Sequence, residues 1–282
     1  MQLSCSPLIS TNQLFELLGN DNLRIIDASW YLPNSERNAL NEFNVCHIAG
    51  AVFFDIDKIS DKETDFPHMA ASAEDFAQAV GEMGISEKYN IVIYDVMGLF
   101  SAARVWWNFC IMGAKNIFVL DGGLSKWIAD GYQVTDKMTN HKQEIFLANE
   151  NSKWIYSAKD ILQLISNSFS NDEQIVDMRP SERFLGKVAE PREGLRSGHI
   201  PKSRSFPFSE LVKDGRLISQ EELRKLFRQK NIDLSKPIIS TCGSGVTAPI
   251  LNLALATLGV DNLSVYDGSW AQWGEGNKYP VT

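Results

Sequence analysis

Cys242 lies where a predicted strand gives way to a predicted helix, which is a position that suits a nucleophile. The apolar run at residues 237–240 predicts the strand, and the run at 248–259 predicts the helix. Gly243 and Gly245 allow a tight turn in which successive backbone N–H groups converge. Such a turn at a helix N-terminus favours an anion, so we expect the Cys242 thiol to ionise readily and to attack an electrophile.

The alternative interpretation of Cys242 is a buried structural cysteine, which is the usual fate of a lone cysteine. Glycines beside such a residue would serve no purpose, which favours the nucleophile. Cys46, next to His47, is a second candidate but lacks a glycine loop. The four cysteines (Cys5, Cys46, Cys110 and Cys242) show no CxxC spacing. This spacing argues against a disulfide framework or a metal site and predicts a reducing compartment.

One pattern of residues occurs twice along the chain. Four segments of the first half have counterparts in the second half, and they are marked by the pairs Asp27 and Asp177, His47 and His199, Asp95 and Cys242, and Asp121 and Asp267. The spacing within these pairs stays between 146 and 152 residues. A spacing that holds through four separate segments indicates a tandem duplication.

Each copy alternates short apolar runs with amphipathic segments, such as residues 71–84 and 219–231. This alternation predicts an α/β fold in which each copy is a parallel sheet flanked by helices. We expect an N-terminal domain at 1–140, a linker at about 141–152, and a C-terminal domain at 153–282. Ligands of such sheets bind beyond the carboxyl ends of the strands, which is where Cys242 is predicted to lie.

The first copy has Asp95 at the position of Cys242. An aspartate repels anions and cannot carry sulfur. The N-terminal domain is therefore expected to be catalytically silent, and the C-terminal domain to be the catalytic one.

The duplicated unit and the loop CGSGVT at 242–247 resemble the rhodanese superfamily, and within it the 3-mercaptopyruvate sulfurtransferases. The likeness covers nearly the whole chain, including the segments IIDASWYLP, GAVFFDID, VWWNF, LDGG and SGHIP. It implies two tandem rhodanese-like domains. It also implies a transferase that moves sulfur from 3-mercaptopyruvate, through a persulfide on Cys242, to cyanide, a small thiol or thioredoxin, with release of pyruvate. No metal or organic cofactor is implied, because the chemistry is covalent catalysis by cysteine.

The loop itself bears on the choice of sulfur donor. Superfamily members specific for thiosulfate carry a basic loop of the CRKGVT kind, whereas Gly243 and Ser244 stand at both basic positions here. Thiosulfate is a dianion and gains from loop cations, while mercaptopyruvate carries one negative charge. The loop therefore favours mercaptopyruvate.

The same resemblance implies that Arg183 and Arg192 hold the carboxylate and carbonyl of the donor. Both lie in an arginine-rich segment, 179–201, and planar guanidinium groups suit a carboxylate. A solvated charged loop is the alternative. Arg179 and Arg196 are expected to be structural. The loop residues Gly243, Gly245, Val246 and Thr247 complete the expected substrate-binding set.

A proton relay is also implied, formed by a loop serine together with a histidine and an acid from the first copy. Ser244 and His47 are expected at the first two positions. The place of the acid falls on Asn38, which cannot stabilise an imidazolium by charge, so Glu36 or Glu42 could replace it. A purely structural role for His47 is left equally open.

Charge and hydropathy exclude several classes of partner. The formal charge is −8, which argues against a nucleic-acid partner because phosphate binding needs a basic face. The N-terminal MQLSCSPLIS lacks a basic segment, and no apolar run is long enough to span a bilayer. We therefore expect a cytoplasmic protein with no membrane partner.

Three rival functions remain to be weighed. A thiosulfate:cyanide sulfurtransferase would use the same chemistry with another donor. A cysteine-loop phosphatase needs an arginine closing a CX5R loop, and that position is Ala248. A non-catalytic binding module of the rhodanese fold would lack the nucleophile, whereas Cys242 is present.

Overall fold

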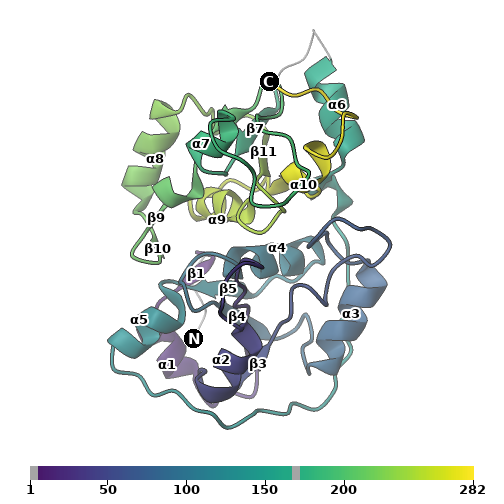
Figure 1. The fold of residues 1–282 in the computed structure, drawn as a ribbon. Coiled ribbons are helices and arrows are strands. Elements are labelled where there is room, and N and C mark those ends of the chain that lie inside the picture. Colours follow the sequence, from purple (N-terminus) through teal and green to yellow (C-terminus); the bar gives the residue numbers. More distant parts are fainter. Residues whose placement is uncertain (1–5, 167–171) are drawn as a thin grey trace. The chain divides into compact units, whose positions relative to one another are not determined.

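The computed structural model describes residues 6–166 and 172–282, and the chain divides into two compact units (Figure 1). Unit 1 contains the chain up to Asp61, together with Ala70–Asn151 and Asp214–Leu217. Unit 2 contains Lys62–Met69, Ser152–Lys213 and Ile218–Thr282. Each unit therefore includes one short segment from the other half of the sequence.

Unit 1 is built on a five-stranded sheet with the order β1-β5-β4-β2-β3, in which every paired strand is parallel. Its strands are β1 (Leu8–Ile9), β2 (Leu23–Asp27), β3 (Ala51–Phe53), β4 (Asn90–Tyr94) and β5 (Ile117–Leu120). Its helices are α1 (Thr11–Leu17), α2 (Ala39–Val45), α3 (Ala73–Glu82), α4 (Ala102–Ile111) and α5 (Gly123–Ala129).

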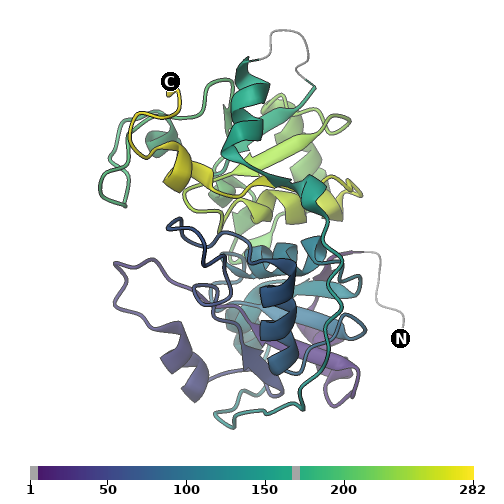
Figure 2. The same cartoon turned by 90° about the vertical axis from the view of Figure 1, so that its right-hand side faces the viewer.

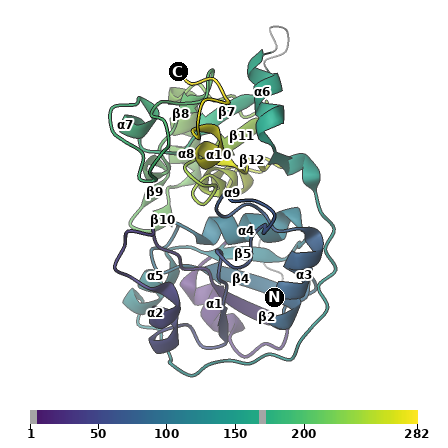
Figure 3. The same ribbon diagram turned by 45° about the vertical axis from the view of Figure 1, so that its right-hand side comes forward.

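Alternation along the strands gives the unit-1 sheet two apolar faces. Helices lie on both sides of the sheet (Figure 3). Ile25 and Val92 point to the face covered by α1, α2 and α5, where they join one buried cluster with Phe43 and Trp127. On the other face, Phe76 of α3 meets Phe109 of α4 edge to face, with ring centroids 5.0 Å apart. The sheet is thus buried on both sides, as parallel sheets require.

Unit 2 repeats this architecture with the strand order β6-β12-β11-β7-β8, again with every paired strand parallel. Its strands are β6 (Ile155–Tyr156), β7 (Gln174–Asp177), β8 (Arg204–Ser205), β11 (Ile238–Thr241) and β12 (Ser264–Tyr266). Its helices are α6 (Ala158–Ser166), α7 (Ser181–Phe184), α8 (Gln220–Gln229), α9 (Pro249–Thr257) and α10 (Ser269–Trp273). Between β8 and α8 the chain forms the short strands β9 (Val212–Lys213) and β10 (Arg216–Leu217).

The helices of unit 2 also cover both faces of the sheet (Figure 1). Ile239 of β11 faces the cluster formed by α6 and α10, which includes Trp270 and Trp273. Ser240, the next residue, faces the opposite side and donates to Asn252 Oδ1 of α9 at 2.8 Å. α8 begins with a capping box between Ser219 and Glu222, the pattern expected at a helix start. The predicted α/β class, with two parallel sheets flanked by helices, is confirmed.

The segment expected to link the copies runs in extended form along the outside of unit 1 (Figure 2). The Glu144 N–H donates to the Gly81 carbonyl of α3 at 3.0 Å, and the Asn149 N–H donates to the Met112 carbonyl at 2.9 Å. The Phe146 ring packs on Phe109 with centroids 5.9 Å apart. This segment therefore belongs to unit 1 as far as Asn151. In the described part of the chain, no helix is long and apolar enough to cross a bilayer.

Asp27 is a buried acid in unit 1. Its counterpart in the second copy has an arginine partner, but Asp27 does not have one at the matching position. The second-copy residue Asp177 forms an ion pair with Arg179, whereas the matching position in the first copy is Ser29. Asp27 accepts the Ser29 N–H at 2.9 Å, and burial raises its pKa to about 6. The folded state then binds a proton on Asp27 more tightly than the unfolded state does. The contribution of Asp27 to the unfolding free energy is therefore most favourable below about pH 4. It falls as the pH rises towards 6.

Replacing Asp27 by Asn should abolish this pH dependence. We expect the unfolding free energy of Asp27→Asn, relative to wild type, to grow by about 2 to 3 kcal/mol between pH 4 and pH 7. Urea unfolding of both proteins across that range is the measurement. A difference that stays constant with pH would show that Asp27 ionises normally in the folded protein.

Candidate active site

Cys242 lies between a buried strand and a helix, as the sequence predicts. β11 ends at Thr241, α9 begins at Pro249, and Cys242 itself is 2% exposed. The Cys242 N–H donates to Ser269 Oγ at 3.2 Å, and the Cys242 carbonyl accepts the Trp270 N–H at 3.0 Å. Main-chain bonds on both sides therefore fix the thiol-bearing residue at the carboxyl edge of the unit-2 sheet.

Ser269 is a residue of this site that the sequence analysis does not single out. Its backbone is left-handed, with φ +49°, which is uncommon for a residue with a Cβ atom. Its buried hydroxyl donates to the Tyr266 carbonyl at 2.9 Å and so can accept from Cys242. The counterpart in the first copy is Gly123, with φ +57°. The backbone of unit 2 is thus strained at Ser269, and the Ser269 hydroxyl holds the Cys242 main chain.

The two loop glycines serve different purposes. Gly245 has φ +78°, a left-handed conformation that favours glycine. Because Gly243 has no side chain, it leaves room for the side chain of Arg183. A Cβ atom at position 243 would lie 3.1 Å from Nη2 of Arg183. The structure therefore brings the Arg183 guanidinium directly against the Cys242 loop.

The matching loop of unit 1 shows what such a turn binds. The Asp95 carboxylate accepts four main-chain N–H groups: those of Gly98 at 2.5 Å, Phe100 at 2.8 Å, Ser101 at 2.9 Å and Ala102 at 2.8 Å. Asp95 is 1% exposed. The loop is an anion cradle, and in unit 1 the chain's own carboxylate fills it.

A histidine from the first half of the sequence contacts the Cys242 loop. Nδ1 of His68 lies 3.1 Å from Ser244 Oγ and 3.3 Å from the Ser244 carbonyl oxygen. His68 is buried, and its segment, Lys62–Met69, belongs to unit 2. Ser244, two residues after Cys242, therefore pairs with His68, whereas the sequence predicts His47 as its partner.

The repeat itself contains a signal that could have found His68. The chain has four histidines, and His47 and His199 occupy matching positions in the two copies. After His199 the second copy has no further histidine, so His68 has no counterpart. A residue found in both copies serves the shared fold, whereas a residue found in one copy is a better candidate for the chemistry of one site.

His47 makes contacts that are typical of a structural residue. It is fully buried, it stacks on Phe43, and its Nδ1 lies 2.7 Å from the Phe43 carbonyl oxygen. Its Nε2 lies 3.2 Å from the Lys137 carbonyl oxygen. His199 repeats the arrangement on Phe184, with Nδ1 2.9 Å from that carbonyl oxygen. Because both ring nitrogens of His47 face main-chain carbonyls, the geometry gives its expected relay role no support.

The residues considered for the relay acid have local contacts in unit 1. Asn38 is the N-cap of α2 and accepts the Asn41 N–H at 2.9 Å. The Glu42 carboxylate is bound by Arg37 and by the Tyr31 hydroxyl at 2.6 Å, and the bond to Arg37 lowers the Glu42 pKa. Glu36 is exposed. None of these contacts links the three residues to Ser244, and the identity of the relay acid stays open.

The two arginines expected to be structural are held within unit 2. Arg179 is 1% exposed and forms ion pairs with Asp177 and Glu190, both at 2.7 Å. Arg196 donates to the carbonyls of Trp273 and Tyr279, both at 2.9 Å, and so ties down the C-terminal segment. Both side chains are committed to partners of the fold.

The remaining predicted residues lie around the loop or near it in sequence. Arg183 is partly exposed and is held by Glu190. Arg192 follows Glu190 by two residues and is half-buried. Val246 is buried and Thr247 is half-buried in the loop between Cys242 and α9. Their roles towards a donor remain predictions.

The other described cysteines are poor nucleophiles in this fold. Burial raises the pKa of Cys110, and burial together with the nearby Asp27 raises the pKa of Cys46. A raised pKa lowers the fraction of thiolate, which is the reactive form. Cys5 lies outside the described residues. Among Cys46, Cys110 and Cys242, only Cys242 lies in a glycine loop at a helix N-terminus.

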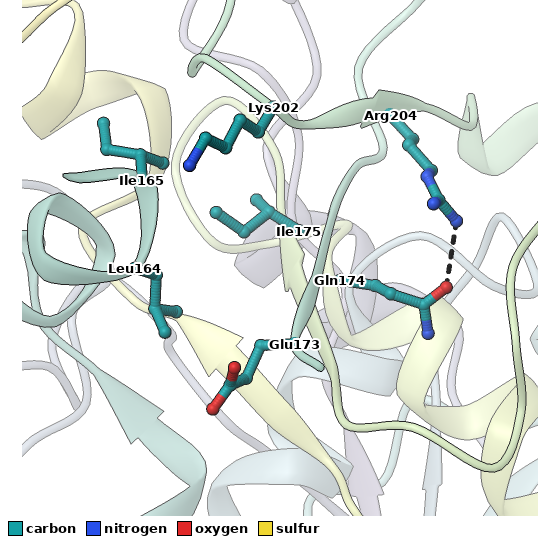
Figure 4. Close-up of a pocket in the computed structure, with 7 residues that line it drawn as sticks. All are labelled: Leu164, Ile165, Glu173, Gln174, Ile175, Lys202 and Arg204. Atoms are coloured by element: carbon teal, nitrogen blue, oxygen red, sulfur yellow. Dashed lines mark hydrogen bonds between the residues drawn. The ribbon is translucent and has the colours of Figure 1, made fainter. Parts of the chain in front are cut away.

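A hollow of about 250 Å³ lies elsewhere on unit 2, between the end of α6 and strands β7 and β8 (Figure 4). Its charged lining is formed by Glu173, Lys202 and Arg204, and Arg204 donates to Gln174 Oε1 at 2.9 Å. Lys202 and Arg204 are exposed, and among the described residues that line the hollow there is no cysteine, serine or histidine.

Comparison with known proteins agrees with this geometry. The model of the rhodanese-like domain matches residues 10–130 and again residues 157–275. The chain belongs to the rhodanese family. The resemblance drawn from the duplicated unit and the CGSGVT loop is therefore confirmed, and both rhodanese-like domains have the sheet architecture described above.

Several curated relatives match this rhodanese chain over almost its whole length. The 3-mercaptopyruvate sulfurtransferase of Escherichia coli K12 is 39% identical over 280 residues, which is 99% of each chain. The mitochondrial thiosulfate/3-mercaptopyruvate sulfurtransferase 1 of Arabidopsis thaliana is 40% identical over 98% of this chain and 78% of that one. A solved structure of an E. coli 3-mercaptopyruvate sulfotransferase superposes with a TM-score of 0.85 at 38% identity, covering 94% of this chain and 99% of that chain.

Substitutions can distinguish the role of His68 from that of His47. We expect His68→Gln to lower the kcat of sulfur transfer by about 10- to 100-fold, because a positioned acid or base contributes at least that much, with little change in Tm. His47→Gln should instead lower Tm and leave the activity of the folded fraction nearly unchanged. Steady-state rates and melting curves of both variants are the measurements. The reverse pattern would restore His47 to the relay.

Proposed function

We propose that this rhodanese is a 3-mercaptopyruvate sulfurtransferase and that Cys242 carries the sulfur. The observation that carries this proposal is the loop in unit 2. There Cys242 lies in an anion-binding turn, the Arg183 guanidinium lies against Gly243, and His68 lies against Ser244. A nucleophile, a cation for the donor and a proton carrier thus meet at one edge of one sheet.

The unit-1 loop supports the view that this turn stabilises a sulfur anion. The donors to Asp95 are the N–H groups of four residues, whose counterparts around Cys242 are Gly245, Thr247, Ala248 and Pro249. Proline has no N–H, so three of the four donors remain. A thiolate or a persulfide anion on Cys242 would take the place of the Asp95 carboxylate and accept these bonds.

The first chemical step follows from this placement. The Cys242 thiolate attacks the sulfur of mercaptopyruvate, and a sulfur–sulfur bond forms as the carbon–sulfur bond breaks. The electron pair of the broken bond leaves with pyruvate as its enolate. The enolate carbon is then protonated, and the Ser244 and His68 pair is placed to deliver that proton.

The second step returns the enzyme to its starting state. An acceptor nucleophile attacks the outer sulfur of the persulfide, and Cys242 leaves as a thiolate. We propose cyanide, a small thiol or thioredoxin as acceptors. A persulfide cycle requires a free thiol, so we also propose a reducing compartment such as the cytoplasm.

The choice of sulfur donor distinguishes the proposed function from a second candidate, in which thiosulfate is the donor. One of the relatives is named for both thiosulfate and 3-mercaptopyruvate, so identity alone does not separate these donors. The loop favours mercaptopyruvate, because residues 243–248 include no lysine or arginine for a dianion. Thiosulfate:cyanide sulfur transfer is the second candidate function.

Cys242 should be the only residue that takes up sulfur. After treatment with mercaptopyruvate and no acceptor, intact-mass analysis is expected to show one added sulfur on wild type, Cys46→Ser and Cys110→Ser. The Cys242→Ser variant should show none and should form no thiocyanate when cyanide is supplied. Sulfur carried on another cysteine, or a Cys242→Ser variant that remains active, would remove the basis of the assignment.

The two arginines should matter most for the keto acid donor. A hydrogen bond from a charged group to a ligand is worth about 1.5 to 3 kcal/mol, so Arg183→Ala and Arg192→Ala should each lower kcat/KM for mercaptopyruvate by roughly 10- to 100-fold. The exposed Arg224 of α8 provides a control, and Arg224→Ala should change kcat/KM less than about two-fold. Thiocyanate production from each donor is the measurement. A wild type that prefers thiosulfate would overturn the proposed donor.

A further inference from the structure

Four charged side chains form a continuous ion-pair network beside the Cys242 loop. Arg179 donates to Asp177 and to Glu190, with shortest distances of 2.7 Å to each. The other oxygen of Glu190 accepts from Nη2 and from Nε of Arg183, the latter at 3.1 Å. Glu190 is therefore shared by both arginines, one on each carboxylate oxygen.

The members of this network differ sharply in exposure. The side chains of Asp177, Arg179 and Glu190 are each 1% exposed, whereas that of Arg183 is 20% exposed. Two positive and two negative charges cancel within the group. Only the guanidinium of Arg183 reaches out of the buried part, and it does so beside Gly243.

Glu190 also determines how the Arg183 guanidinium is presented. It engages Nε and Nη2, and among the residues that the structure describes no protein acceptor bonds Nη1. Nη2 lies 3.1 Å from the place of a Gly243 Cβ atom, and Nη1 lies 3.9 Å from it. One edge of the guanidinium is thus held by Glu190, while the group as a whole rests on the loop.

We infer that Glu190 is a positioning residue that sets the charge preference of the sulfur-donor site. By pairing with Arg183 it cancels the guanidinium that lies against Gly243, in a loop whose residues 243–248 include no lysine or arginine. A donor with one negative charge can bind through hydrogen bonds to Arg183 at little electrostatic cost. A dianion needs net positive charge at the loop, and Glu190 removes it. This inference rests on the proposed function and names the feature of its site that selects a monoanionic donor.

The decisive variant is Glu190→Gln, which keeps the shape of the side chain and its oxygen acceptor but removes the negative charge. We expect kcat/KM for sodium thiosulfate, with cyanide as acceptor, to rise at least ten-fold above wild type at low ionic strength. The value for mercaptopyruvate should not rise by a similar factor. The thiosulfate gain should shrink in 0.5 M salt, because screening weakens the attraction between the loop and a dianion.

Glu182 provides the matched control. It lies on the same short helix as Arg183, it is exposed, and Glu182→Gln makes the same change in net charge. This control should change kcat/KM for either donor less than two-fold. An equal thiosulfate gain in Glu182→Gln would assign the effect to overall charge and overturn the inference.

A purely structural role for Glu190 gives a different result, because misplacing Arg183 lowers the use of both donors by similar factors. That outcome, or an unchanged value for thiosulfate, overturns the inference. If Glu190→Gln does not fold, as judged by its melting curve, Ser244→Lys takes its place, because it adds to the loop the positive charge that Glu190 cancels. A rise in kcat/KM for thiosulfate at low ionic strength is again expected, and an unchanged value overturns the inference. Each result is a change relative to wild type, so it can be judged whichever donor the wild type prefers.

Discussion

Backbone N–H groups that converge behind a parallel strand must be given an anion, since buried donors without an acceptor are costly. Unit 1 meets this constraint with Asp95, whose carboxylate accepts four of them. In unit 2 the same position is Cys242, a residue that becomes an anion only when its thiol ionises or carries sulfur. The cradle is made of main chain, and unit 2 has an N–H group at three of the four matching positions, because Pro249 stands at the place of Ala102. The side chain at its first position decides whether it is filled permanently or is available for chemistry.

The charged side chains beside the Cys242 loop are paired with one another, just as the buried polar groups are paired with hydrogen-bond partners. Arg179 is fully buried, and a buried guanidinium is tolerated only with partners, which Asp177 and Glu190 supply. Because Glu190 also binds Arg183, one carboxylate connects the buried framework of unit 2 with the guanidinium that lies against Gly243. The fold therefore influences the electrostatics of the site through a residue that itself has almost no exposed surface.

The sequence was sufficient to predict the strands, the helices and the position of Cys242 between them, because these depend on local patterns. Apolar runs that end on Asp27, Asp177 and Cys242 marked the strands, and the two glycines marked the loop. His68 could not be found this way, since it lies in an irregular segment and reaches Ser244 through a contact between residues far apart in sequence. His47 was assigned to the relay through the family resemblance, but it is a residue that both copies share: His47 and His199 each stack on a phenylalanine.

The two copies share one fold although only the second has a cysteine in its loop. Each unit contains a segment from the other half: Lys62–Met69 brings His68 to the loop of unit 2, and Asp214–Leu217 brings Arg216 to Asp121 of unit 1, at 2.8 Å. The loop of unit 1 keeps its backbone course because Asp95 satisfies the N–H groups that a sulfur anion would otherwise need to satisfy. In unit 1 the loop therefore keeps its conformation without a nucleophile. The first half of the sequence still contributes to the loop of unit 2, through the contact of His68 with Ser244.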